Sequence, residues 1–205
     1  MLISGRGSNM LRVLDAVDAG QLPATPAVVL SDTPTAAGLA LAAQRGIETA
    51  VCVPRDDADR DTWARALTAQ LEAVGVELVA LAGFMRVLPT VFCTHWQGRL
   101  LNIHPSLLPR HKGLDTHQRA LDAGDREAGC SVHFVTAELD GGPVIAQSRV
   151  AIQDGETAGT LAERVLKREH VLYPQVLTWC ATGRITLRHG HVHWDNTKLA
   201  APLEV

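Results

Sequence analysis

Residues 99–109 read Arg-Leu-Leu-Asn-Ile-His-Pro-Ser-Leu-Leu-Pro, an apolar run that meets two polar side chains and is stopped by proline. On an extended chain, Asn102 and His104 point to one face and their apolar neighbours Leu101 and Ile103 to the other. Pro105 cannot donate to a sheet ladder and disfavours a helical residue before it, so we expect a strand that ends here. Ligands bind beyond the carboxyl ends of strands in open parallel sheets, so this end is a candidate site.

Uniform apolar runs alternate with helical patterns before this strand. We expect strands at 2–3, 26–30, 49–53 and 77–82, and helices at 10–17, 36–44 and 58–74, the last led by Asp56, Asp57 and Asp59. This alternation is typical of a parallel sheet buried on both faces, with right-handed crossovers that bring the strand tips to one edge. The prediction is an α/β fold, a Rossmann-like, doubly wound, mostly parallel sheet.

The second half of the chain adds strands with a different pattern. Helices are expected at 89–96, 116–122 and 157–181, the last kinked by Pro174, and strands at 129–135 and 144–152. Residues 129–135 alternate, so that strand should have one wetter face or pair antiparallel. Residues 183–194 predict a C-terminal β-hairpin, in which His189, His191 and His193 indicate a solvated edge more than a metal site.

Composition limits the classes of function. A chain of 205 residues with 46% hydrophobic content predicts one domain. It has neither an apolar run of about 18 residues nor a basic-then-apolar leader, so we expect a cytoplasmic protein without a membrane partner. A net charge of −3 with both signs interspersed argues against nucleic acid and favours small-molecule substrates. The four cysteines form no C-x-x-C pair, which argues against a zinc site.

A glycine loop, Ser-Gly-Arg-Gly-Ser-Asn, joins the first strand to the first helix at residues 4–9. Gly5 and Gly7 allow the backbone to approach a ligand closely, and Ser8 or Asn9 can cap a helix whose amides favour an anion. The loop lacks the Lys-Ser/Thr end of a P-loop, and Met10 stands where a dinucleotide fingerprint has its third glycine. The loop therefore predicts a phosphate monoester site, against the alternative of a plain glycine turn.

Two further loops carry composition suited to a site. Residues 83–88, Gly-Phe-Met-Arg-Val-Leu, could pack under a loop or form an apolar slot for a flat heteroaromatic ligand. Residues 140–143, Asp-Gly-Gly-Pro, predict a sharp loop that passes close to another group.

The candidate side chains suit a reaction that forms an oxyanion. Asn102 is a neutral donor, His104 can carry a proton near neutral pH, and Asp140 can orient a charged imidazole. No nucleophile elbow, H-E-x-x-H motif or phosphate-loop lysine is present, so we expect the nucleophile to arrive with a substrate. Direct acyl transfer between two bound substrates fits these groups.

Several separated motifs occur in one order, at residues 2–9, 82–88, 101–109, 113–114, 131–135, 138–144, 169–170 and 173–174. With these motifs the chain resembles the glycinamide ribonucleotide formyltransferase family, enzymes of purine biosynthesis that use 10-formyltetrahydrofolate as co-substrate and no metal. The resemblance implies a single formyltransferase domain over residues 1–205, a monomer or homodimer. Its N-terminal half would bind the phosphate or nucleotide, and its C-terminal half would bind folate and carry catalysis.

The resemblance also implies roles for individual residues. The catalytic residues would be Asn102, His104 and Asp140, and Asn102 would also contact the folate. The phosphoribosyl substrate would be held by Gly7, Ser8 and Asn9, and its glycinamide or ribose portion by Glu169. The pterin slot would be lined by Met85, Arg86, Val87 and Leu88, with Arg60 at the outer part of the folate. Two positions depart from the family. The first strand is expected to be short. Leu166 stands where some family members have a polar or cationic phosphate contact, so either Lys167 or Arg168 substitutes for it or the affinity for phosphate is weaker.

Three alternatives compete with this interpretation. Formyltetrahydrofolate hydrolase and methionyl-tRNA formyltransferase share the Asn-x-His motif, but each normally carries an additional domain for which 205 residues leave no room. A non-catalytic nucleotide-binding module would place Asp32 near a ribose.

Overall fold

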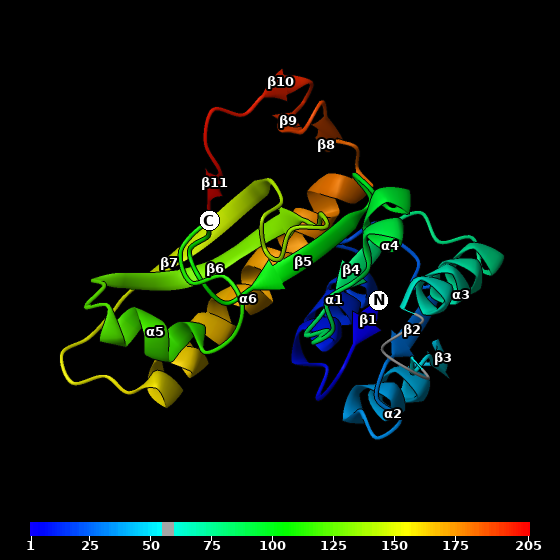
Figure 1. The fold of residues 1–205 in the computed structure, drawn as a ribbon, viewed down its shortest axis with the longest axis horizontal. Helices are drawn as coiled ribbons and strands as arrows, with labels where there is room; N and C mark the ends of the chain where they lie inside the picture. The colour runs from blue at the N-terminus through cyan, green and yellow to red at the C-terminus, as the bar shows by residue number, and fades with distance from the viewer. Residues whose placement is uncertain (55–59) are drawn as a thin grey trace.

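The computed structural model describes residues 1–54 and 60–205 and, within them, one eight-stranded sheet with helices on both faces (Figure 1). The strands are β1 (Leu2–Ile3), β2 (Val28–Ser31), β3 (Glu48–Val51), β4 (Val79–Leu81), β5 (Leu100–His104), β6 (Glu127–Phe134), β7 (Val144–Ala151) and β11 (Leu203–Glu204). The helices are α1 (Ser8–Asp18), α2 (Ala37–Gln44), α3 (Arg60–Ala73), α4 (Thr90–His95), α5 (Thr116–Asp122) and α6 (Ala158–Ala181). Among these helices none is both long and apolar enough to cross a bilayer.

The strand order is β11-β7-β6-β5-β4-β1-β2-β3, and β1 to β5 run parallel. The predicted doubly wound, mostly parallel sheet is confirmed. Helix α3 begins at Arg60 in the described residues, and the expected acidic lead of Asp56, Asp57 and Asp59 lies outside them. Helix α6 continues through Pro174 to Ala181.

Two apolar layers hold the helices to the sheet. One layer joins α1, α2 and α6 to the strands, and the other joins α3 and α4 to the opposite face. Leu101 and Ile103 of β5 lie in the first layer, as the alternation predicts. The buried Tyr173 of α6 donates its hydroxyl to the carbonyls of Leu81, at 2.9 Å, and Leu101, at 3.3 Å, which ties α6 to the two strands that lead into the site.

Strand β6 decides between the two alternatives for residues 129–135. It pairs antiparallel with β5 and β7, which confirms that alternative, and it has no wetter face, because residues 128–134 are buried. The polar side chains on it have partners. The Ser131 hydroxyl donates to the Ser106 carbonyl at 2.7 Å and accepts from the Leu108 amide at 3.0 Å.

A small antiparallel sheet follows α6 and lies apart from the main sheet (Figure 1). It contains β8 (Ile185–Arg188), β9 (His191–Trp194) and β10 (Thr197–Lys198), and it includes the predicted hairpin. Trp194 packs edge-on against Trp179 of α6 at 5.0 Å between ring centroids. His193 donates Nδ1–H to the His191 carbonyl, and the described residues contain no group of three or more His, Cys, Asp or Glu side chains placed to hold a metal ion.

Candidate functional site

The end of β5 carries two of the predicted side chains, and the strands on its two sides run in opposite directions. Asn102 lies across from Leu81 of the parallel β4 and from His133 of the antiparallel β6. His104, the last residue of β5, lies across from Ser131. Both side chains therefore project where the parallel part of the sheet meets its antiparallel part, with His104 buried and Asn102 half-buried.

The loop after β6 turns back onto the sheet because of its glycines. Asp140 has φ of +45°. A Cβ at position 142 would lie 1.8 Å from the Phe134 carbonyl oxygen, so only glycine fits at Gly142. The Phe134 amide also donates to the Pro143 carbonyl at 3.0 Å. The predicted close approach is confirmed, and it carries the Asp140 carboxylate to the end of β5.

Asp140 receives three polar neighbours. Its Oδ2 lies 3.5 Å from His104 Nδ1 and accepts the Gly113 amide at 2.9 Å, and its Oδ1 lies 3.7 Å from His133 Nε2. The second nitrogen of His104, Nε2, lies 3.0 Å from the His111 carbonyl oxygen. Because a carbonyl only accepts, Nε2 of His104 must carry a proton in this arrangement.

His133 is a site residue that the sequence reasoning missed. Its Nδ1 donates to the Phe134 carbonyl at 3.0 Å, and its Nε2 lies 3.2 Å from Asn102 Nδ2. Burial lowers the pKa of His133, which favours the neutral ring, so Nε2 accepts one amide proton of Asn102. The other Asn102 amide proton remains available. The feature that could have identified His133 is its cross-strand pairing with Asn102, but that pairing depends on the register of β5 and β6, which the sequence alone does not give.

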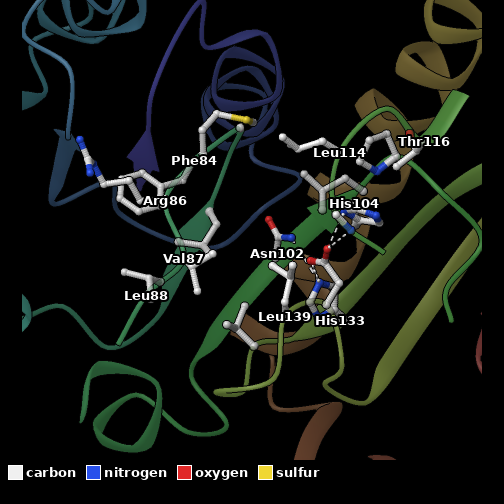
Figure 2. A pocket seen from close by; sticks show the side chains of 18 of the residues that line it. Phe84, Arg86, Val87, Leu88, Asn102, His104, Leu114, Thr116, His133 and Leu139 are labelled. Carbon is white, nitrogen blue, oxygen red and sulfur yellow. Dashed lines mark hydrogen bonds and ion pairs between the residues drawn. The ribbon is translucent and has the colours of Figure 1, made fainter. Parts of the chain in front are cut away.

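These side chains line a cavity of about 410 Å³ (Figure 2). Its other walls include the predicted Met85, Arg86, Val87 and Leu88, together with Phe84, Leu114, His117 and Leu139. Figure 2 shows Phe84, Val87 and Leu88 on the side of the cavity opposite His104 and His133. A volume of this size, with apolar walls and a few convergent polar groups, fits a flat heteroaromatic ring.

The loop at residues 83–88 is fastened from three sides. The Met85 amide donates to the Ser4 hydroxyl at 2.9 Å, and Arg86 Nε donates to the buried Asp32 carboxylate at 2.9 Å. Arg60 donates its Nη2 to the Val87 carbonyl. Arg60 does not line the cavity; it is exposed and supports the loop from outside.

The glycine loop forms a second group outside the cavity lining. Gly7 is the N-cap of α1 with φ of +76°, and no side chain in the part of the chain that the structure describes caps the helix, so the expected cap by Ser8 or Asn9 is wrong. Ser8 is the first residue of the helix. Asn9 instead donates Nδ2 to Oε2 of Glu169, on α6, at 2.6 Å.

The pair of Asn9 and Glu169 is buried and incompletely satisfied. Burial raises the pKa of Glu169, and the hydrogen bond from Asn9 opposes that shift. Asn9 Oδ1 is buried without a hydrogen-bond partner among the described residues. A buried acceptor without a donor is costly, so this position suits a ligand that brings an N–H or O–H group. Leu166 is half-buried one turn before Glu169, while Lys167 and Arg168 are exposed.

Comparison with known proteins connects this geometry to one family. The sequence profile described as "Formyl transferase" matches residues 1–177. The Escherichia coli (strain K12) protein named phosphoribosylglycinamide formyltransferase is 43% identical over 199 residues, which cover 97% of this chain and 94% of that protein.

Solved structures agree with the sequence comparison. The phosphoribosylglycinamide formyltransferase of Coxiella burnetii superposes with a TM-score of 0.94 at 41% identity, covering 99% of this chain and 96% of that one. A formyltetrahydrofolate deformylase from Pseudomonas putida superposes with a TM-score of 0.84 at 26% identity, covering 94% of this chain and 68% of that one.

Proposed function

Because the chain belongs to the formyl transferase family, we propose that it transfers a formyl group from 10-formyltetrahydrofolate to the amine of glycinamide ribonucleotide, a step of purine biosynthesis. The observation that carries the proposal is the convergence of Asn102, His104 and Asp140 on one wall of a cavity whose opposite wall is apolar. The first wall offers polar groups to a reacting carbonyl, and the second accepts a ring system.

The folate would occupy the cavity with its pterin against Met85, Arg86, Val87 and Leu88. The side chains of Ser4, Asp32 and Arg60, which hold this loop, would preorganise the slot before the ligand arrives. Arg60, exposed beside the slot, would meet the outer, anionic part of the folate.

The phosphorylated amine would bind along the glycine loop. Within residues 1–54 and 60–205, no backbone carbonyl accepts the Ser8 and Asn9 amides in the first turn of α1, and Gly7 lets the backbone approach a phosphate. Asn9 Oδ1 and the Glu169 carboxylate would receive N–H or O–H donors of the glycinamide or ribose portion. Ser4 links the two binding regions, because it precedes Gly5 and its hydroxyl accepts the Met85 amide.

The reaction follows from these positions. The substrate amine attacks the formyl carbon, a C–N bond forms, and the carbonyl oxygen becomes an oxyanion. The second amide proton of Asn102 would donate to that oxygen. The Nε2–H of His104, which also donates to the His111 carbonyl, would be the other donor. Asp140 would hold the His104 ring and would take the amine proton, directly or through a water. That proton would pass to the folate nitrogen as the bond between this nitrogen and the formyl carbon breaks.

The test is a mixed assay with protein, glycinamide ribonucleotide and a 10-formyl folate, followed by the absorbance of the deformylated folate. We expect a signal that requires both substrates and is lost in His104→Ala. Loss of formyl folate without the amine would favour a hydrolase instead. No turnover by folded protein would leave only a binding module.

A further inference from the structure

The segment at residues 110–116 supplies two backbone groups to the His104–Asp140 pair. The His111 carbonyl accepts the Nε2–H of His104 at 3.0 Å, and the Gly113 amide donates to Asp140 Oδ2 at 2.9 Å. One short segment therefore fixes which nitrogen of His104 is protonated and where the carboxylate stands. Its own position must be set by something else, since α5 begins only at Thr116.

The His111 side chain provides an anchor. Its Nε2 donates to Asp125 Oδ2 at 2.8 Å, and both side chains are only 15% and 17% exposed. Asp125 follows α5, so this contact closes the loop that contains α5 by joining its two ends. Arg110 Nη1, 3.5 Å from Asp125 Oδ1, adds a positive charge on the same side. The low exposure of His111 and Asp125 limits the screening of their contact by solvent, whereas Arg110 is exposed.

The backbone at His111 makes this anchor more important. His111 has φ of +52°, a region that few residues other than glycine adopt. The preceding residue is held independently, because the Ser106 hydroxyl donates to the Arg110 carbonyl at 2.7 Å. Beyond His111, the contact of Lys112 with Glu138 is exposed on the Glu138 side, so solvent weakens it, and the support from Arg119, which donates to the carbonyls of Lys112 and Leu114, comes from an exposed side chain.

We propose that His111 and Asp125 are a positioning pair for formyl transfer, and that their contact keeps the His111 carbonyl and the Gly113 amide against His104 and Asp140. Neither His111 nor Asp125 is among the residues that line the cavity. The pair acts by preorganising the oxyanion donor. This inference rests on the proposed function for its kinetic part only.

The kinetic test uses Asp125→Ala, His111→Asn and the double variant. Asparagine tolerates the left-handed backbone but is too short to reach Asp125, so His111→Asn removes the contact without adding strain. We expect kcat to fall roughly ten- to a hundredfold in each single variant, with both KM values nearly unchanged, as for other small misplacements of reacting groups. The double variant should be no worse than either single one, because both remove the same contact.

A second histidine–carboxylate pair in this chain serves as the control. His95 Nε2 lies 2.9 Å from Glu72 Oε1 between α4 and α3, and neither residue lines the cavity. Glu72→Gln should leave kcat unchanged. Asp125→Asn, which keeps an acceptor oxygen in place, should recover most of the rate lost in Asp125→Ala. Unchanged or increased kcat in folded His111→Asn, or additive losses in the double variant, would overturn the proposal.

A measurement without substrates separates this inference from the proposed function. In ¹⁵N–¹H NMR spectra of the free protein, His104 should show a protonated Nε2 in the wild type and in Asp125→Asn. That signal should shift or broaden in Asp125→Ala and His111→Asn. If it is identical in all four folded proteins, the pair does not position His104. If it changes as expected but no variant or wild type transfers formyl, the positioning stands and the proposed function fails.

Discussion

Asp140 Oδ2 lies 3.5 Å from Nδ1 of His104, and each side chain is less than a tenth exposed. The contact joins the glycine-rich loop after β6 to the end of β5, two segments far apart in the sequence. Because water is largely excluded there, the position of each group depends on the other and on the backbone contacts of residues 111–113.

Replacing one member of this pair should remove activity and spare the fold. Asp140→Asn keeps the volume and the acceptor for the Gly113 amide but loses the charge. We expect kcat to fall by ~10²–10³, the range found when one oxyanion-stabilising group is removed. His104→Ala should lose a similar amount. The thermal midpoint should move by only a few degrees. Steady-state kinetics with calorimetry checks this, and near-normal kcat in either variant would remove the assigned role.

A comparison of variants at Gly7 and Gly46 separates the effect of backbone strain from the effect of a lost ligand contact. At Gly7→Ala the new Cβ meets Gly38 Cα at 3.0 Å and the end of Met10 at 3.1 Å, so the loop must shift. Gly46 has a similar φ of +73° with open space around it, so Gly46→Ala carries the strain alone, about 1 kcal/mol or more. We expect KM for the phosphorylated amine to rise roughly tenfold in Gly7→Ala only. Equal KM values in the two variants would refute a phosphate role for this loop.

Glu169 predicts a pH-dependent gain in stability. Burial raises its pKa in the folded state, so the contribution of the protonated form is fully present at acid pH and is lost as pH rises through the folded pKa. Because glutamine does not ionise, Glu169→Gln removes this loss of stability with rising pH. We expect the thermal midpoint of the variant to exceed that of the wild type near pH 7 and to equal it near pH 4, measured by thermal melts across pH. The same variant should bind the phosphorylated amine more weakly. A stability difference independent of pH would contradict this account.

The contact of Arg86 with Asp32 predicts an effect confined to the folate. Asp32→Asn retains the side-chain volume but loses the charge that holds Arg86 and hence the loop at 83–88. For a partly exposed pair we expect an effect of up to about 1 kcal/mol, so KM for the folate should rise roughly fivefold with kcat little changed. Asp15→Asn, which removes the charge from surface contacts with Arg12 and Arg45, is the control and should change neither constant. A rise in KM for the amine alone would point to Asp32 as a ribose contact instead.

The predictable part of the fold came from local patterns. Alternation at residues 100–104 and the proline after them located β5, and the uniform runs before it located the parallel strands. The sharp loop at residues 140–143 followed from its glycines. In each case the deciding property, side-chain period or backbone freedom, belongs to residues adjacent in sequence.

What could not be predicted depends on contacts between distant segments. Asn9 turns away from its helix end because Glu169, in α6, binds its amide, so a rule based on local capping failed. His133 enters the site through its register with Asn102, and β11 exists only because β7 offers an edge. The contact with His104 is made by the His111 carbonyl, a group that every residue has, so residue type gives no signal of that contact.

Formyl transfer with a ¹³C-labelled formyl folate tests the central claim most directly. When wild-type protein, labelled folate and glycinamide ribonucleotide are mixed, the ¹³C resonance should move from the folate to the amide of the product, and Asp140→Asn should slow that movement by ~10²–10³. Label that appears as free formate, or that moves equally fast in Asp140→Asn, would contradict direct transfer by these residues.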